Sequence, residues 1–173
     1  MKSILITGCN RGLGLGLVKH LVKTLQPPEN IFATCRNVNK AREILPLLKM
    51  ASNNFADKSK MNVNRAAVIN MSSILGSIAD NNEGGYYPYR CSKAALNAAT
   101  KSMSIDLKKD GILVTSLHPG WVRTDMGGTN APMDVNTSVT NILNTLNLLN
   151  EEHTGCFIQH DGKILSWFLN ICI

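Results

Sequence analysis

The feature that most constrains this sequence is a glycine-rich turn between an apolar strand and a helix. Residues 3–7, SILIT, are apolar and β-branched and are followed by Gly8, which predicts a short buried strand. Leucine recurs every four residues across 11–25, which predicts a helix that ends before Pro27. Residues 31–35, IFATC, predict a second strand. This strand–helix–strand order favours an α/β fold with a parallel sheet.

The remaining chain continues the alternation of strands and helices. Strands are expected at 66–71, 112–117 and 155–159, and helices at 38–51, 87–109 and 134–149, with a polar loop at 52–65. We therefore predict a three-layer, doubly wound sheet of about five parallel strands in a single domain, residues 1–173. A proline inside a helix kinks or breaks it, so Pro46 marks a possible seam near residues 44–46.

Composition and charge exclude several classes of protein. Apolar residues make up 44% of the chain, which is too many for a disordered protein, and no apolar run reaches the roughly 18 residues that a membrane span needs. The basic residues behind the net charge of +6 are scattered, so we expect no nucleic acid and no membrane as partner. Five cysteines without a CxxC pair and four histidines without metal-ligand spacing indicate reduced thiols and no metal site. We expect a soluble, cytoplasmic protein.

The glycine turn itself is suited to a pyrophosphate. Gly8, Gly12 and Gly14 lack a Cβ atom, so the turn can be tight and an anion can approach the backbone at the start of the following helix. The alternative is a turn that is glycine-rich for structural reasons alone. Arg36 follows the second predicted strand, and Arg11 lies within the turn. Cations at these positions favour the 2′-phosphate of NADP over NAD, unless both are ordinary surface arginines.

A tyrosine and a lysine four positions apart form a second candidate site. Tyr89 and Lys93 share one face of a predicted helix, so the ammonium is expected beside the phenol. A neighbouring cation lowers the pKa of a phenol toward the range in which it exchanges protons near neutral pH. Such a pair also arises often by chance. Ser73 ends the preceding strand and is placed to hydrogen-bond a substrate carbonyl, and Ser72 is a near-equal candidate by spacing.

Four motifs together carry a family resemblance. They are TGCNRGLG at 7–14, VINMSS at 68–73, YRCSK at 89–93 and HPGWVRTDM at 118–126. In combination they resemble the short-chain dehydrogenase/reductase family, and within it the sniffer and C-factor group of carbonyl reductases. The resemblance implies a Rossmann-like fold and hydride transfer between NADP(H) and a small-molecule carbonyl or alcohol.

The same resemblance implies a role for each site residue. Tyr89 would be the proton donor or acceptor, Lys93 would bind the nicotinamide ribose and tune Tyr89, and Ser73 would polarise the carbonyl. The implied cofactor contacts are Gly8, Arg11, Gly12, Leu13, Gly14, Arg36, Lys93, Pro119, Gly120, Val122 and Thr124.

The chain departs from the family pattern in its middle. Between Arg36 and Ser73 the family carries two further strands with their helices, an Asn-Asn-Ala-Gly motif and an asparagine that completes the catalytic tetrad, and this sequence has none of them. Residues 37–44 resemble the helix after the family's second strand, and residues 45–52 resemble a much later helix, which implies an internal deletion at the seam. The tail at 168–173 is also atypical. Family members are usually homo-oligomers, and part of that interface is missing here.

Three outcomes stay open for this sequence. The first is an active NADP-dependent carbonyl reductase on a compacted sheet. The second is a splice or gene-model variant that acts as a non-catalytic nucleotide-binding or interaction module, for instance with a full-length relative. The third is a chain that does not fold stably. Without the missing strand, the first strand must either pair with the strand that ends at Ser73 or leave an unpaired edge in the core.

Overall fold

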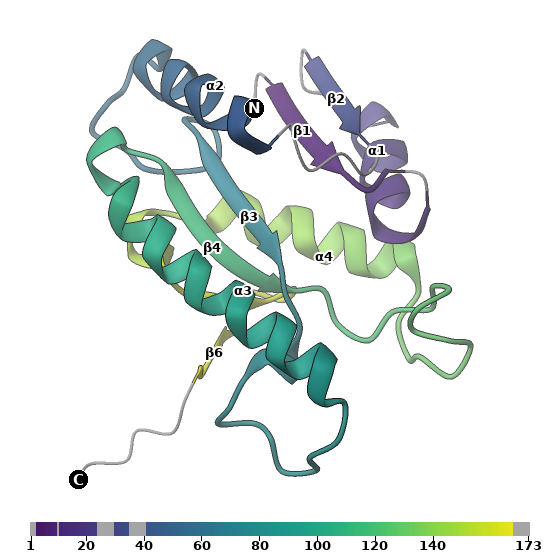
Figure 1. Cartoon of the computed structure of the whole chain (residues 1–173). Coiled ribbons are helices and arrows are strands. Elements are labelled where there is room, and N and C mark those ends of the chain that lie inside the picture. Colours follow the sequence, from purple (N-terminus) through teal and green to yellow (C-terminus); the bar gives the residue numbers. More distant parts are fainter. Residues whose placement is uncertain (1–2, 10, 24–29, 35–40, 168–173) are drawn as a thin grey trace, which may run out of the picture.

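The computed structural model describes residues 3–9, 11–23, 30–34 and 41–167, and its elements follow the predicted order (Figure 1). The strands are β1 (Ser3–Thr7), β2 (Asn30–Thr34), β3 (Ala67–Met71), β4 (Leu113–His118), β5 (Phe157–Gln159) and β6 (Ile164–Leu165). The helices are α1 (Gly12–Lys23), α2 (Ala41–Asn54), α3 (Tyr87–Asp106) and α4 (Val135–Leu148). Short 3-10 turns are η2 (Ile74–Gly76), η3 (Lys108–Asp110) and η4 (Glu151–His153). The predicted α/β class is confirmed.

The strands form two sheets where the sequence predicts one. β1 pairs in parallel with β2, with Ile4 opposite Ile31. β3 pairs in parallel with β4, β4 pairs in parallel with β5, and β6 adds an antiparallel end strand. The five expected parallel strands are therefore present, but within the described residues β1 and β3 are not paired with each other. Each of these two strands keeps one edge on which no described strand lies.

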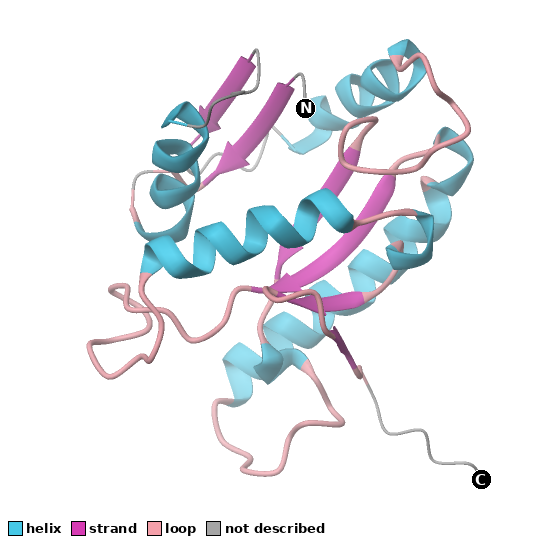
Figure 2. Ribbon diagram, turned by 180° about the vertical axis from the view of Figure 1, so that it is seen from behind, coloured by secondary structure: helices cyan, strands magenta, loops and turns pink. Residues whose placement is uncertain are grey.

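Helices cover both faces of the larger sheet, which gives the three predicted layers. α3 lies on one face of β3 and β4, and α4 covers the other face with α1 beside it (Figures 1 and 2). Ile6 of β1 lies in the same buried apolar cluster as Leu117 and Ile142. Helices α1 and α4 approach closely, since a Cβ atom on Gly16 of α1 would lie 2.6 Å from Cγ1 of Val135 of α4. Burial of side chains, and not strand pairing, therefore attaches the smaller sheet to the rest.

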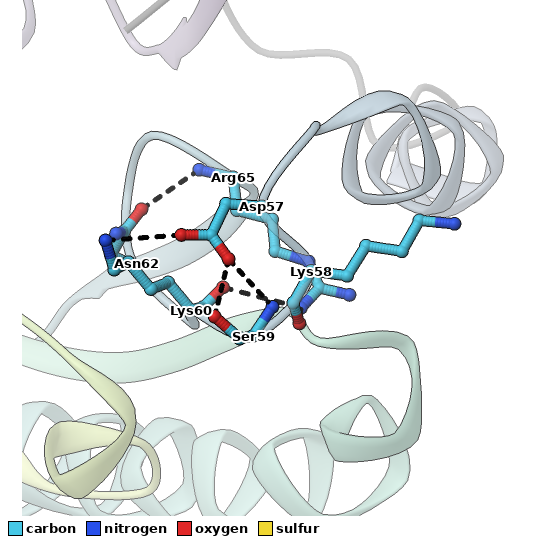
Figure 3. A network of polar contacts seen from close by, with 6 residues as sticks. All are labelled: Asp57, Lys58, Ser59, Lys60, Asn62 and Arg65. Atoms are coloured by element: carbon cyan, nitrogen blue, oxygen red, sulfur yellow. Dashed lines mark hydrogen bonds and ion pairs between the residues drawn. The ribbon is translucent and has the colours of Figure 1, made fainter.

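The connection between α2 and β3 is a loop of polar contacts (Figure 3). Asp57 accepts hydrogen bonds from the hydroxyl and the backbone N–H of Ser59 and pairs with Lys60, and these contacts hold the pKa of its carboxyl below the ordinary value. Arg65 closes the loop, because its Nε donates at 2.8 Å to the buried hydroxyl of Ser52 in α2. The loop thus fixes the start of β3 against the end of α2.

Two elements differ from the prediction. α2 extends to Asn54, so residues 52–54 are helical and not loop, and Pro46 does not end the helix. The seam near 44–46 stays a prediction. The sequence does not predict β6, because two residues are too few to show a period. The tail at 168–173 lies outside the described residues, and in the part that is described no helix has the length and apolar character to cross a bilayer.

Candidate active site

The glycine turn joins the end of β1 to the start of α1. Gly8 has a φ of +71°, and a Cβ atom there would meet nothing within 4 Å, so open space lies beside its backbone. Gly14 is tightly packed, because a Cβ atom there would overlap the Gly8 carbonyl oxygen and lie 2.9 Å from the carbonyl carbon. The first position therefore needs glycine for its left-handed backbone and the second for close packing of helix on turn. Leu13 packs against the core cluster.

The loop that follows β4 lies against this turn. A Cβ atom on Gly12 would lie 3.6 Å from Cγ2 of Thr124, and Arg11 Nη1 pairs with Asp125 Oδ2 at 2.8 Å. Next to these contacts is an open depression of about 330 Å³, lined by Gly12, Leu15, Gly16, Lys19, Arg123, Thr124, Asp125 and Val135. The fold thus brings together the motifs at 7–14 and 118–126. Arg11, however, faces a carboxylate of the chain itself, and Arg36 lies outside the described residues.

Internal contacts fix the shape of the loop after β4. The Pro119 carbonyl accepts a hydrogen bond of 2.7 Å from Ser138 Oγ, which anchors the loop to α4. Gly120 has a φ of +88°, a conformation that favours glycine. Val122 is 5% exposed and forms a parallel bridge with Met133, so its side chain supports the loop from inside.

Tyr89 and Lys93 lie on one face near the start of α3. Tyr86 caps this helix in a left-handed conformation, and Pro88 occupies the first turn, where a proline is tolerated. Lys93 Nζ lies 5.6 Å from the centre of the Tyr89 ring and donates at 2.9 Å to the carbonyl oxygen of Met71. Burial of the ammonium lowers the pKa of Lys93. The expected juxtaposition is present, and Lys93 also ties α3 to the end of β3.

The two serines after β3 have different partners. Ser72 is 4% exposed and donates from Oγ at 2.7 Å to Oδ1 of Asn97. Ser73 caps η2, and its Oγ accepts the N–H of Leu75 at 3.2 Å. Among the described residues no acceptor takes the Ser73 hydroxyl proton. The contacts therefore favour Ser73 as the serine able to donate to a substrate oxygen, which the spacing alone did not decide.

Sequence reasoning missed the polar face by which α3 packs on the sheet. The buried residues of α3 are Asn97, Thr100 and Ser104, all of them polar. Thr100 Oγ1 accepts hydrogen bonds of 2.9 Å from Asn70 and from Ser116. With Lys93 these positions follow helical spacing, and that spacing was the available signal.

A second missed feature is a half-buried histidine, His118, at the end of β4. Burial and the neighbouring His160 lower the pKa of His118 to about 4. Its Nδ1 is buried, with no hydrogen-bond partner in the described part of the chain. His118 is therefore neutral near pH 7, directly before the loop that carries Pro119 and Gly120.

The layered sheet, the glycine turn and the Tyr–Lys pair at the end of β3 define a Rossmann-like α/β protein with its candidate site at the carboxyl ends of the strands. A profile of the enoyl-(acyl carrier protein) reductase family matches residues 48–148, which is more than half of the chain. The C-signal protein of Myxococcus xanthus is 47% identical over 100 residues, which cover 58% of this chain and 60% of that protein. The chain belongs to the short-chain dehydrogenase/reductase family.

Two solved structures resemble the whole described fold. The carbonyl reductase Sniffer of D. melanogaster is 40% identical with a TM-score of 0.88, and the alignment covers 96% of this chain and 100% of that one. An NADPH-bound carbonyl reductase from chicken fatty liver is 30% identical with a TM-score of 0.80, covering 96% and 99%. By sequence, the matches span only 60% and 45% of the lengths of two curated relatives.

Proposed function

We propose that this chain is an NADP-dependent carbonyl reductase that transfers a hydride between NADP(H) and a small-molecule carbonyl or alcohol. The observation that carries the proposal is the position of the Lys93 ammonium, 5.6 Å from the centre of the Tyr89 ring and bonded to the end of the strand that leads to Ser73. Membership in a family of oxidoreductases supports the reaction class. Two similar structures are carbonyl reductases, and one of them is bound to NADPH.

Each of the three side chains has a distinct role in this proposal. Ser73 donates a hydrogen bond to the carbonyl oxygen of the substrate and polarises it, since its hydroxyl proton is not used within the described residues. Tyr89 gives a proton to that oxygen in the reducing direction and takes it back in the oxidising direction. Lys93 places a positive charge beside the phenol, and this charge stabilises the phenolate that remains. When bound, the cofactor supplies or accepts the hydride.

The glycine turn fits the pyrophosphate of a dinucleotide. The open space beside Gly8 and the N-terminus of α1 offer backbone N–H groups and a favourable dipole to an anion. Thr124 and Gly120, on the adjacent loop, would hold the nicotinamide end. Arg11 would bind the 2′-phosphate of NADP. Its pair with Asp125 is largely exposed, 62% and 74%, so the contact is weak in water and a phosphate can replace the carboxylate.

The proposed function is tested by NADPH oxidation with aromatic and quinone carbonyls. We expect turnover by the native sequence and its loss in Tyr89→Phe, which keeps the ring and removes only the hydroxyl. Tyr87→Phe is the matched control, because Tyr87 is in the same helical turn and is 76% exposed. Turnover that survives Tyr89→Phe would refute the role assigned to the phenol. Turnover that is equally lost in Tyr87→Phe would show that the assay reports stability and not chemistry.

The divided sheet favours a second candidate function, a non-catalytic nucleotide-binding or interaction module. Among the described strands, β1 and β3 each keep an edge without a strand partner, and unpaired edges favour association with another chain. Co-purification with a full-length relative, together with NADPH binding but no turnover, would support this function. A cooperative melt would dismiss the possibility that the chain does not fold stably.

Partners and location follow the same proposal. The proposed partners are the carbonyl substrate and NADP(H), with no nucleic acid and no membrane. The proposed location is the reducing cytoplasm, which an odd number of cysteines without a CxxC pair favours. Members of the family are usually homo-oligomers, and size-exclusion chromatography at several protein concentrations shows whether this chain also forms them.

A further inference from the structure

The segment that carries Ser73 is bonded to α3 by two side chains, the amide of Asn97 and, at 3.5 Å, the guanidinium of Arg90. This segment, residues 72–76, leaves the end of β3 and contains η2. Asn97 of α3 accepts the hydroxyl of Ser72 at 2.7 Å and donates, at a longer 3.4 Å, to the carbonyl oxygen of Gly76. One buried amide therefore contacts both ends of the segment, and Ser73 lies between the two contacts. Asn97 itself is 2% exposed, so water does not compete for these bonds.

The same segment presses directly on Lys93. A Cβ atom on Gly76 would lie 2.8 Å from Cβ of Lys93 and 3.1 Å from Nδ2 of Asn97. Because Gly76 has no side chain, the segment can pack directly against α3 at Lys93. This contact buries the stem of Lys93, while its Nζ bonds the Met71 carbonyl just before the segment begins.

The other two buried polar residues of α3, Thr100 and Ser104, make their hydrogen bonds elsewhere. Thr100, one turn further along α3, bonds Asn70 and Ser116 inside the sheet. Ser104, a further turn along, donates only to the carbonyl of Lys101 in its own helix. Among the described residues of α3, the side chains of Asn97 and Arg90 bond the 72–76 segment. Arg90 reaches only the carbonyl of Leu75, at 3.5 Å, whereas the buried amide of Asn97 bonds both ends of the segment. Hydrogen bonds are directional, so they fix the rotation and slide of a helix on a sheet more closely than apolar contact does.

We propose that Asn97 is a positioning residue, which clamps the 72–76 segment onto α3 and so sets Ser73 at a fixed place relative to Lys93 and Tyr89. The catalytic meaning of this clamp rests on the proposed function. The clamp itself consists of hydrogen bonds, so it is present whether or not the chain catalyses a reaction. Without the amide, Ser72 loses its acceptor and Gly76 can lift from the helix. Lys93 then becomes more exposed, and Ser73 loses its fixed relation to the phenol.

The test compares three variants of the full chain. Asn97→Ala removes the clamp, and Ser72→Ala removes only the hydroxyl that the clamp holds. Ser104→Ala is the matched control, because it removes a buried hydroxyl from the same polar face of α3 and makes no contact with the 72–76 segment. The first readout needs no activity: the pH midpoint for reductive methylation of the Lys93 amine, followed by mass spectrometry. We expect the midpoint to rise toward that of an exposed lysine in Asn97→Ala and Ser72→Ala, and to stay unchanged in Ser104→Ala.

The second readout is the division between kcat and KM in NADPH oxidation. We expect kcat to fall by about 10- to 100-fold in Asn97→Ala, with the KM for NADPH unchanged, because a displacement of about 1 Å can cost that much. The double variant Ser72→Ala/Asn97→Ala should be no worse than Asn97→Ala, since Asn97→Ala already breaks the bond that Ser72→Ala removes.

The outcomes separate this inference from the proposed function. If the native chain shows no turnover but Asn97→Ala and Ser72→Ala still shift the Lys93 midpoint, the proposed function is refuted and the clamp is retained. An unchanged midpoint in Asn97→Ala, or an equal shift in Ser104→Ala, would overturn the clamp. If Asn97→Ala fails to fold, Ser72→Ala decides, because it leaves the amide and its bond to Gly76 in place.

Discussion

Replacing Gly14 by alanine adds a single methyl group next to the backbone of the candidate nucleotide site. Gly14 is the third residue of α1, and its added methyl would overlap the Gly8 carbonyl oxygen and lie 3.2 Å from Cα of Cys9. Alanine in a helix is worth about 1 kcal/mol over glycine, whereas overpacking costs about 1–3 kcal/mol. The obstructing atoms belong to backbone and cannot rotate away, so the cost is at the upper end. We expect a net loss of about 1–2 kcal/mol in the free energy of unfolding.

The assay for Gly14→Ala is urea unfolding followed by circular dichroism, with and without NADPH. The matched control is Gly16→Ala in the same helix, where the methyl would meet Cγ1 of Val135 at 2.6 Å and Cγ2 of Val139 at 3.2 Å. Those atoms are side-chain methyl groups that can shift, so we expect Gly16→Ala to keep the stabilisation by NADPH and Gly14→Ala to lose it. A Gly14→Ala chain that is as stable as the native one, and equally stabilised by NADPH, would show that close packing of Gly14 on the turn is not needed for stability or nucleotide binding.

Three further predictions follow from individual contacts. The pKa of His118 lies near 4 in the folded chain against 6.5 for a free histidine, so the unfolded chain takes up the proton first and the free energy of unfolding falls as the pH drops from 6.5 to about 4. The fall is at most about 3 kcal/mol, and urea titrations across this range should show it flattened in His118→Gln. Ser52→Ala leaves the Nε of Arg65 without its acceptor, and chemical unfolding should show a loss of about 1–3 kcal/mol, whereas no loss would contradict the role of that loop. Asp125→Asn releases Arg11, so calorimetry should show tighter binding of NADPH with little change for NADH, and an equal gain for both would remove Arg11 from the 2′-phosphate.

Local patterns predicted most elements because each depends on neighbouring residues. The apolar run at 3–7 and the spacing of Val135, Val139, Ile142 and Leu146 identify β1 and α4 to within a residue. The Tyr–Lys juxtaposition was equally accessible, because positions four apart on a helix share a face whatever the rest of the fold does.

Strand pairing and partner choice were less accessible to sequence reasoning. A run such as 66–71 indicates a strand without stating which strand lies beside it, so the division into two sheets emerges only when the tertiary contacts are known. The polar face of α3 was missed for a related reason. Asn97 and Thr100 are unfavourable in a core unless specific partners satisfy them, and those partners lie far away in sequence. Arg11 likewise found a carboxylate 114 positions away.

Thermal unfolding of the purified chain, with and without NADPH and NADH, shows whether the chain folds cooperatively and binds NADPH. A ligand that binds only the folded state raises the melting temperature by mass action. We predict a cooperative transition whose melting temperature rises with NADPH and rises less with NADH. The absence of a transition, or a transition that neither nucleotide shifts, would contradict it: the divided sheet would then carry the motifs of the family without a working nucleotide site.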